Sequence, residues 1–70
     1  MNIKEISHWS ELPVNVPVNV FVTDDVEVAK VAFEKKFGFA CEVAYRLNNK
    51  WLMVMDPGYV LDGQPEESEA

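Results

Sequence analysis

Hydrophobic and polar residues alternate strictly from position 13 to position 20, where PVNVPVNV repeats a four-residue unit. A period of two predicts a strand with one apolar face. Because proline has no N–H to donate to a sheet, we expect an edge strand, paired fully from Val18 onward, with residues 13–17 extended but unpaired. Proline and asparagine on its outer face would discourage pairing with another chain. The residues expected to face a helix are Val14, Val16, Val18, Val20 and Val22.

The segment TDDVEVAKVAFEKKFG, residues 23–38, has the period of an amphipathic helix. Asp24 is expected to cap its N-terminus, with Glu27 completing a capping box. Lysines in the last turn and Gly38 after it are typical of a helix C-terminus. At 100° per residue, Val31 is the one apolar residue on the solvent side. The predicted core face contains Val26, Val28, Ala29, Ala32, Phe33 and Phe37.

Residues 39–47 alternate again, and KWLMVM, residues 50–55, predicts a returning strand. Asn48 and Asn49 between them suit a two-residue type I′ turn, because asparagine tolerates positive φ. The resulting fold class is α+β: a small antiparallel-containing sheet with a β-α-β-β core and one helix packed on one face.

The two ends of the chain add weaker patterns. Residues 1–7 are interpreted as a short strand, and SHWSELP as one helical turn stopped by Pro13. The apolar segment 59–61 is expected to fold back on the domain. We therefore predict a single domain over residues 1–62 and a disordered acidic tail over residues 63–70.

Composition restricts the function classes. Seventy residues form one domain that buries only about 60% of its unfolded surface. One cysteine forms no internal disulfide, which favours a reducing, cytoplasmic location, and no segment is long and apolar enough to span a membrane. The formal net charge is −6, with five acids and no base in the last fifteen residues and seven acids against six bases before them. An acidic chain whose helix lysines point in different directions is not expected to bind nucleic acid directly.

Candidate chemistry is sparse. His8 and Cys41 occur once each and have no spaced partner, so Cys41 is interpreted as a buried, inert residue on the face shared with Val43 and Tyr45, and His8 as a surface residue. The carboxylates of Asp24, Asp25 and Glu27 are explained by helix capping. We therefore predict no catalytic, cofactor-binding or metal-binding residues and no enzymatic activity.

The hairpin supplies the candidate binding surface. A two-residue turn pairs Arg46 with Trp51 and points Val43, Tyr45, Leu52 and Val54 towards the helix. The opposite face would then expose large apolar groups unless the N-terminal segment, residues 59–61 or a protein partner covers them. The candidate partner-binding residues are Glu42, Arg46, Trp51, Met53 and Met55. A three-residue turn is the alternative, since one residue of slip would move Trp51, Met53 and Met55 into the core.

Residues 18–56, with a helix entered through VTDDVEVAKVAF and a following hairpin in one small acidic domain, resemble the plan of small phage-encoded inhibitors of the anti-CRISPR kind. The resemblance implies a non-catalytic protein that binds and blocks a host nucleoprotein complex. The near-neutral body departs from nucleic-acid imitation and favours steric blocking. The alternative is a self-assembling module, in which the same sheet face or the valine edge strand forms a two-fold homodimer.

Overall fold

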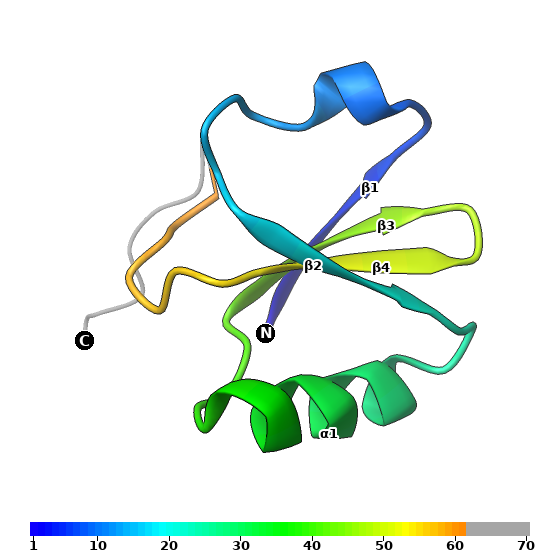
Figure 1. Ribbon diagram of the computed structural model, residues 1–70. Helices are drawn as coiled ribbons and strands as arrows, with labels where there is room; N and C mark the ends of the chain where they lie inside the picture. The colour runs from blue at the N-terminus through cyan, green and yellow to red at the C-terminus, as the bar shows by residue number, and fades with distance from the viewer. Residues whose placement is uncertain (62–70) are drawn as a thin grey trace.

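The computed structural model describes residues 1–61. The element order is β1 (Asn2–Ile6), the 3-10 turn η1 (Trp9–Glu11), β2 (Val18–Val22), α1 (Val26–Phe37), β3 (Val43–Leu47) and β4 (Lys50–Val54). Figure 1 shows α1 on one side of the sheet and the segment containing η1 on the other. The α+β prediction, with one helix on one face of a small sheet, is confirmed. The predicted tail, residues 63–70, lies outside the described residues.

The four strands form one mixed sheet in the order β1-β3-β4-β2. β3 pairs antiparallel with β4, and β4 antiparallel with β2. The N-terminal strand β1 runs parallel to β3, and its first backbone N–H, that of Asn2, donates to the carbonyl of Glu42 at 2.8 Å. The predictions of an N-terminal strand and of an edge position for β2 are both confirmed.

The β3–β4 hairpin has the predicted two-residue turn, with Leu47 opposite Lys50 and Arg46 opposite Trp51. The register slip considered above therefore does not occur. The turn type differs from the prediction: Asn48 has φ 54°, whereas Asn49 does not have a positive φ. A type I′ turn needs positive φ at both central residues, so that assignment is wrong.

The two copies of the PVNV repeat adopt different conformations. In the first copy, Val14 and Asn15 form a turn in which Asn15 has φ 66°, so the prediction that residues 13–17 are extended is wrong. In the second copy, β2 begins at Val18 as predicted. The carbonyl of Pro17 accepts a hydrogen bond from the backbone N–H of Met55 at 3.1 Å. Proline thus contributes the one hydrogen-bonding group that its backbone has.

Helix α1 starts one residue later than expected. Asp25, not Asp24, is its N-cap, because the Asp25 carboxylate accepts from the backbone N–H of Glu27 at 2.9 Å. The hydroxyl of Thr23 in turn accepts from the Asp25 N–H at 3.1 Å. At the other end, Gly38 has φ 85° and donates its N–H to the carbonyl of Glu34, as the sequence predicts.

One core lies between α1 and the sheet. The Phe33 ring is at its centre, 4.8 Å from the Phe37 ring and 5.5 Å from the Phe39 ring between centroids. Phe21 of β2 meets Phe33 edge-on at 6.5 Å. The buried members of this helix-side core are Ala29, Phe33, Cys41, Ala44, Trp51 and Met53.

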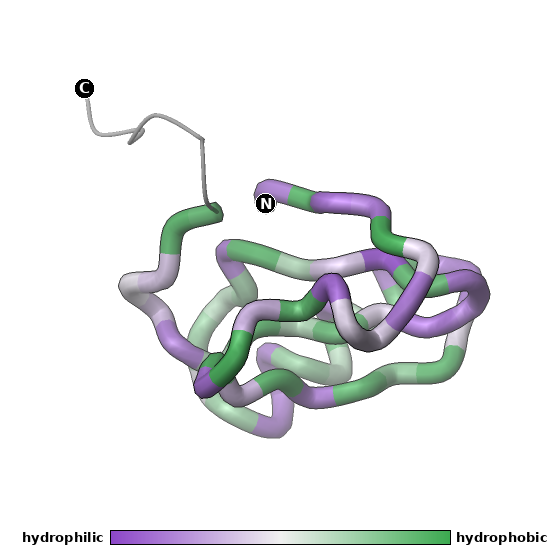
Figure 2. Tube along the Cα trace, turned by 90° about the horizontal axis from the view of Figure 1, so that it is seen from above, coloured by the Kyte–Doolittle hydropathy of each residue, from purple (hydrophilic) through white to green (hydrophobic). Residues whose placement is uncertain are grey.

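A second core lies on the other face of the sheet. Its buried members are Ile6, Val43, Tyr45, Leu47, Leu52, Val54 and Leu61. Leu12 and Val16 cover it from the loop between β1 and β2, and Tyr59 covers it from the C-terminal side, with Tyr45 and Tyr59 hydroxyls 3.0 Å apart. The described chain ends in a hydrophobic stretch (Figure 2). The prediction that residues 59–61 fold back on the domain is confirmed.

The helix therefore covers the face opposite to the predicted one. Phe21, rather than the valines of β2, contacts the helix-side core, whereas Val16 and Val18 pack in the second core. Val20 and Val22, further along β2, are exposed. Both faces of the hairpin are apolar, so the pattern alone favours neither. The face that receives α1 is the one on which Phe21, Phe33, Phe37 and Phe39 pack together.

Candidate functional site

The hairpin residues predicted to bind a partner do not form an exposed surface. Trp51 is 5% exposed, and Met53 is fully buried beneath α1. Met55 is half-buried against the same core. The expected exposure of Trp51 and Met53 is wrong, because α1 packs on their side of the sheet and leaves Val43, Tyr45, Leu52 and Val54 to the second core.

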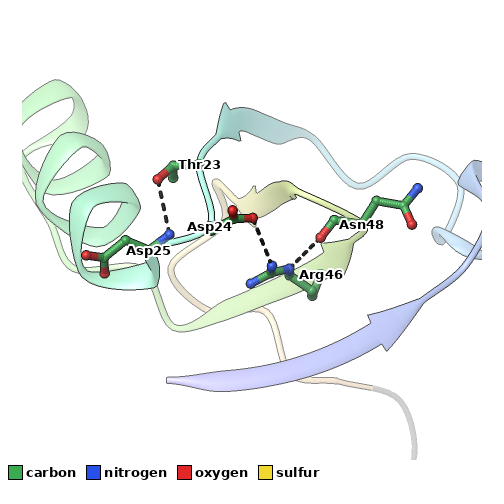
Figure 3. A network of polar contacts seen from close by, with 5 residues as sticks. All are labelled: Thr23, Asp24, Asp25, Arg46 and Asn48. Atoms are coloured by element: carbon green, nitrogen blue, oxygen red, sulfur yellow. Dashed lines mark hydrogen bonds and ion pairs between the residues drawn. The ribbon is translucent and has the colours of Figure 1, made fainter.

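Arg46 covers the Trp51 ring at the rim of the helix-side core, and Figure 3 shows its polar contacts with Asp24 and Asn48. Its guanidinium carbon lies 4.5 Å from the centroid of the Trp51 ring. Its Nε donates to the carbonyl of Asn48 at 2.7 Å, and its Nη2 lies 3.4 Å from a carboxylate oxygen of Asp24. These contacts explain Arg46 as a structural residue that links the hairpin turn to the start of α1.

Glu42, the remaining predicted binding residue, is exposed immediately before β3. Its backbone carbonyl holds the first residue of β1. Among the five predicted residues, the structure gathers Trp51, Met53 and Met55 at the helix-side core, places Arg46 over Trp51, and leaves Glu42 exposed outside that core.

Cys41 and His8, the two candidate reactive groups, both make local structural contacts. Cys41 is buried as predicted, its thiol donates to the carbonyl of Val43 at 3.1 Å, and burial raises the pKa of the Cys41 thiol. It packs in the helix-side core rather than with Val43, because it precedes the first residue of β3. His8 is exposed and accepts from the Ser10 N–H at 3.1 Å as the cap of η1.

Carboxylates are also dispersed. Asp25 caps α1, Asp24 contacts Arg46, and Glu27 forms an ion pair with Lys30 at 3.6 Å. Within residues 1–61, no group of three or more His, Cys, Asp or Glu side chains is arranged to hold a metal ion. The same span has no helix with the length and apolar character needed to cross a membrane.

A small hollow lies at the second core, between Lys4, Glu11, Pro13, Tyr45, Tyr59 and Leu61. Its volume is about 130 Å³, below the roughly 300 Å³ at which small-molecule sites begin. The Glu11 carboxylate accepts from the N–H and hydroxyl of Ser7 at 3.0 Å and 2.9 Å, and these hydrogen bonds lower the pKa of Glu11. Glu11 thus closes the turn around η1.

A wider but shallow and open hollow lies on α1, on the side away from the sheet. Val28 and Val31 are each 55% exposed, although Val28 was predicted to face the core. Together with Ala32 they form the floor of an open groove of about 510 Å³, flanked by charged side chains. We call this surface the outer face of α1, and it comprises Glu27, Val28, Val31, Ala32 and Lys35.

The outer face of α1 was not predicted from the sequence, because half of the helix circumference was assigned to the core. Only Ala29 and Phe33 of α1 are buried. Successive helix residues are 100° apart, which places Val28 about 60° from Val31 and about 100° from Ala29. A narrower core arc, centred on Ala29 and Phe33, would have placed Val28 with Val31.

No protein-family model matches the chain. No curated protein matches it, and no solved structure does either. Its function is therefore inferred from the arrangement of its own side chains.

Proposed function

We propose that this protein is a non-enzymatic, protein-binding module that docks through the outer face of α1. One observation carries the proposal: Val28 and Val31 lie adjacent on an exposed helix surface, with a groove of about 510 Å³ between charged flanks. An amphipathic or apolar partner surface docking there would remove both valines from water. The outer face of α1 replaces the hairpin surface predicted from the sequence.

The rest of the described side-chain chemistry supports binding rather than catalysis. Asp25, Glu11 and His8 form local caps and turns, and Arg46 covers Trp51. These interactions occupy groups that an enzyme would direct towards a substrate. The buried, protonated thiol of Cys41 suits a reducing, cytoplasmic compartment.

Affinity capture with matched variants tests the proposal. A tagged chain, cross-linked in cells that also express the untagged chain, is expected to recover a defined protein. Val31→Glu is expected to lose that protein, because it places a charge in the groove. Val14→Glu is the control, since Val14 is 84% exposed in the loop before β2. Equal recovery by both variants would refute docking through α1.

The resemblance between the plan of residues 18–56 and that of phage-encoded inhibitors favours a specific role, the steric blocking of a host nucleoprotein complex. In bacteria with an active CRISPR defence, expression of the chain is expected to raise phage plating. Unchanged plating with the wild-type chain would remove the inhibitor role. Docking through α1 is judged separately by the capture experiment.

A further inference from the structure

The outer face of α1 has an apolar centre that helix stability does not explain. Val28 and Val31 are one turn apart and more than half exposed. Valine forms helices less readily than alanine, lysine or glutamate, which are the residues usual at exposed helix positions. The two valines therefore weaken the isolated helix slightly. Contact with another surface would explain why they are present at exposed positions.

The charges on this face are ordered. Glu27 lies towards the N-terminus of α1 and Lys35 towards its C-terminus, and Val31 is midway between them in sequence. At 1.5 Å per residue, each charge is about 6 Å along the helix axis from Val31. Reversal of the helix direction exchanges the acidic and basic ends, so the face is complementary to its own reversed copy.

We propose that the partner bound by the outer face of α1 is a second copy of this chain, joined antiparallel about a two-fold axis at Val31. Glu27 then lies opposite Lys35 of the partner subunit, and the two Val31 side chains meet at the axis. Val28 lies between Ala32 of the partner subunit and Lys35 of the partner subunit. The small Ala32 side chain allows the helices to approach closely. The inference rests on the proposed docking function of α1 and names its partner.

Electrostatics permits this pairing despite the net charge of −6. Within about 100° of Val31 around α1 lie Glu27, Lys30, Glu34 and Lys35, two charges of each sign, so the facing surfaces carry no net charge. Antiparallel helix dipoles also attract. The ion pair between Glu27 and Lys30 is solvent-exposed, with side chains 72% and 42% accessible, so it competes only weakly with the new contact.

The sheet edges are poorer places for self-association. Pro17 interrupts the donors immediately before the β2 edge, and β1 carries Lys4 and Glu5 at the other edge. Both devices discourage pairing between strands of two copies. Neither device acts on the outer face of α1, because it is not a strand edge.

The interface is small, which fixes the concentration range of the test. Twelve residues make α1 about 18 Å long, and stable interfaces bury about 800 Å² per partner. We therefore expect a weak dimer with a dissociation constant on the order of 100 µM. Sedimentation velocity of the full chain, from roughly 20 µM to 1 mM, should show the average mass rise towards that of a dimer.

Val31→Glu is the central variant. It places two carboxylates together at the two-fold axis, so we expect the dissociation constant of the dimer to rise at least about tenfold. The monomer should keep its helix, because the introduced carboxylate is attracted to Lys35 and repelled by Glu27 to a similar extent, each four residues away. Val14→Glu adds the same charge elsewhere and should dimerise as the wild type does. Circular dichroism establishes that each variant is folded.

A charge exchange tests the antiparallel geometry itself. Glu27→Lys and Lys35→Glu should each weaken the dimer, whereas the double variant should recover most of the loss by restoring both pairs in reversed order. Failure of the folded double variant to recover would overturn the two-fold arrangement at Val31. A wild-type chain that stays monomeric at 1 mM would overturn self-association altogether.

The capture experiment separates this inference from the proposed function. Recovery of the untagged chain by the wild-type bait, lost with Val31→Glu, supports both. The wild-type bait could instead recover a different protein, and Val31→Glu could lose it. If the chain is also monomeric by sedimentation, this result keeps the docking function and refutes the second copy as partner. If Val31→Glu changes neither the capture result nor the sedimentation result, both the docking function and the second copy as partner are refuted.

Discussion

The guanidinium carbon of Arg46 lies 4.5 Å from the centroid of the Trp51 ring, so a charged side chain covers the aromatic edge of the helix-side core. The two residues are direct cross-strand partners in the β3–β4 hairpin. Trp51 is buried, and its indole N–H finds no hydrogen-bond acceptor among the described residues. Coverage by Arg46 therefore keeps water from the ring without satisfying its polar atom.

Arg46→Ala should lower the free energy of unfolding by about 1 kcal/mol, through loss of the cation–π contact and of apolar coverage. Its ion pair with Asp24 adds little, because that carboxylate is 83% accessible. Fluorescence in a Trp9→Phe background should shift to longer wavelength as Trp51 meets water. Arg46→Lys keeps the charge but loses the planar stack, so its free energy of unfolding should lie between those of the wild type and Arg46→Ala. No change in either readout would contradict the covering role.

Trp51→Ala should destabilise the fold strongly, by about 3–5 kcal/mol, because it empties a site beneath α1. In a chain of this size such a loss is comparable to the whole stability, so Trp51→Phe is the informative second variant. Urea unfolding measures both. A Trp51→Ala protein that unfolds at the wild-type midpoint would return Trp51 to the surface and restore the hairpin as a docking candidate.

The start of α1 allows a comparison of neighbouring residues. Asp25→Ala should cost about 1 kcal/mol, because it leaves the Glu27 N–H without its capping acceptor. Asp24→Ala removes only an exposed ion pair and should cost at most a few tenths of a kcal/mol. Chemical unfolding of both variants, supported by helix content from circular dichroism, decides the cap. The reverse order of costs would restore the cap predicted from the sequence.

Cys41 should make stability depend on alkaline pH. Burial raises the pKa of its thiol, so the folded state favours the protonated form. This contribution is fully present below the ordinary thiol pKa, about 8.5, and is lost as pH rises through the folded value. Cys41→Ala should lose core packing but show a shallower decline in stability above that pH. Parallel pH profiles for the two proteins would show that other groups cause the decline.

The hairpin register and the helix C-terminus were predictable from the sequence because local chemistry determines them. Asn48 and Asn49 accommodate a two-residue turn, and Gly38 adopts the left-handed conformation that ends α1. Each feature depends on residues adjacent in the chain. Such contacts leave a clear pattern in the sequence.

The choice of sheet face was not predictable, because it depends on residues far apart in the chain. Trp51 and Leu52 point to opposite faces, and both are buried, one beneath α1 and the other beneath the loop and the C-terminal segment. The outer face of α1 was missed for the same reason. Whether Val28 is buried depends on how far the sheet extends around the helix, and β2 and β4 are the strands that pack most extensively against α1.

The PVNV repeat provides the last test, since the same four-residue sequence adopts two conformations. Asn15, at φ 66°, lies in the left-handed region, where a Cβ without a local hydrogen-bonding group costs about 1–2 kcal/mol. Asn15→Ala should therefore destabilise the protein by about 1 kcal/mol, while Asn15→Gly should be nearly neutral. Asn19→Ala, at the equivalent position in β2, should change stability by only a few tenths of a kcal/mol, because its backbone is ordinary strand. Urea unfolding of the three variants checks this order. At position 19 glycine should be less stable than alanine, the reverse of position 15, because Asn19→Gly weakens the strand. Equal effects at Asn15 and Asn19 would mean that both copies of the repeat have one conformation, contrary to the turn at Val14 and Asn15.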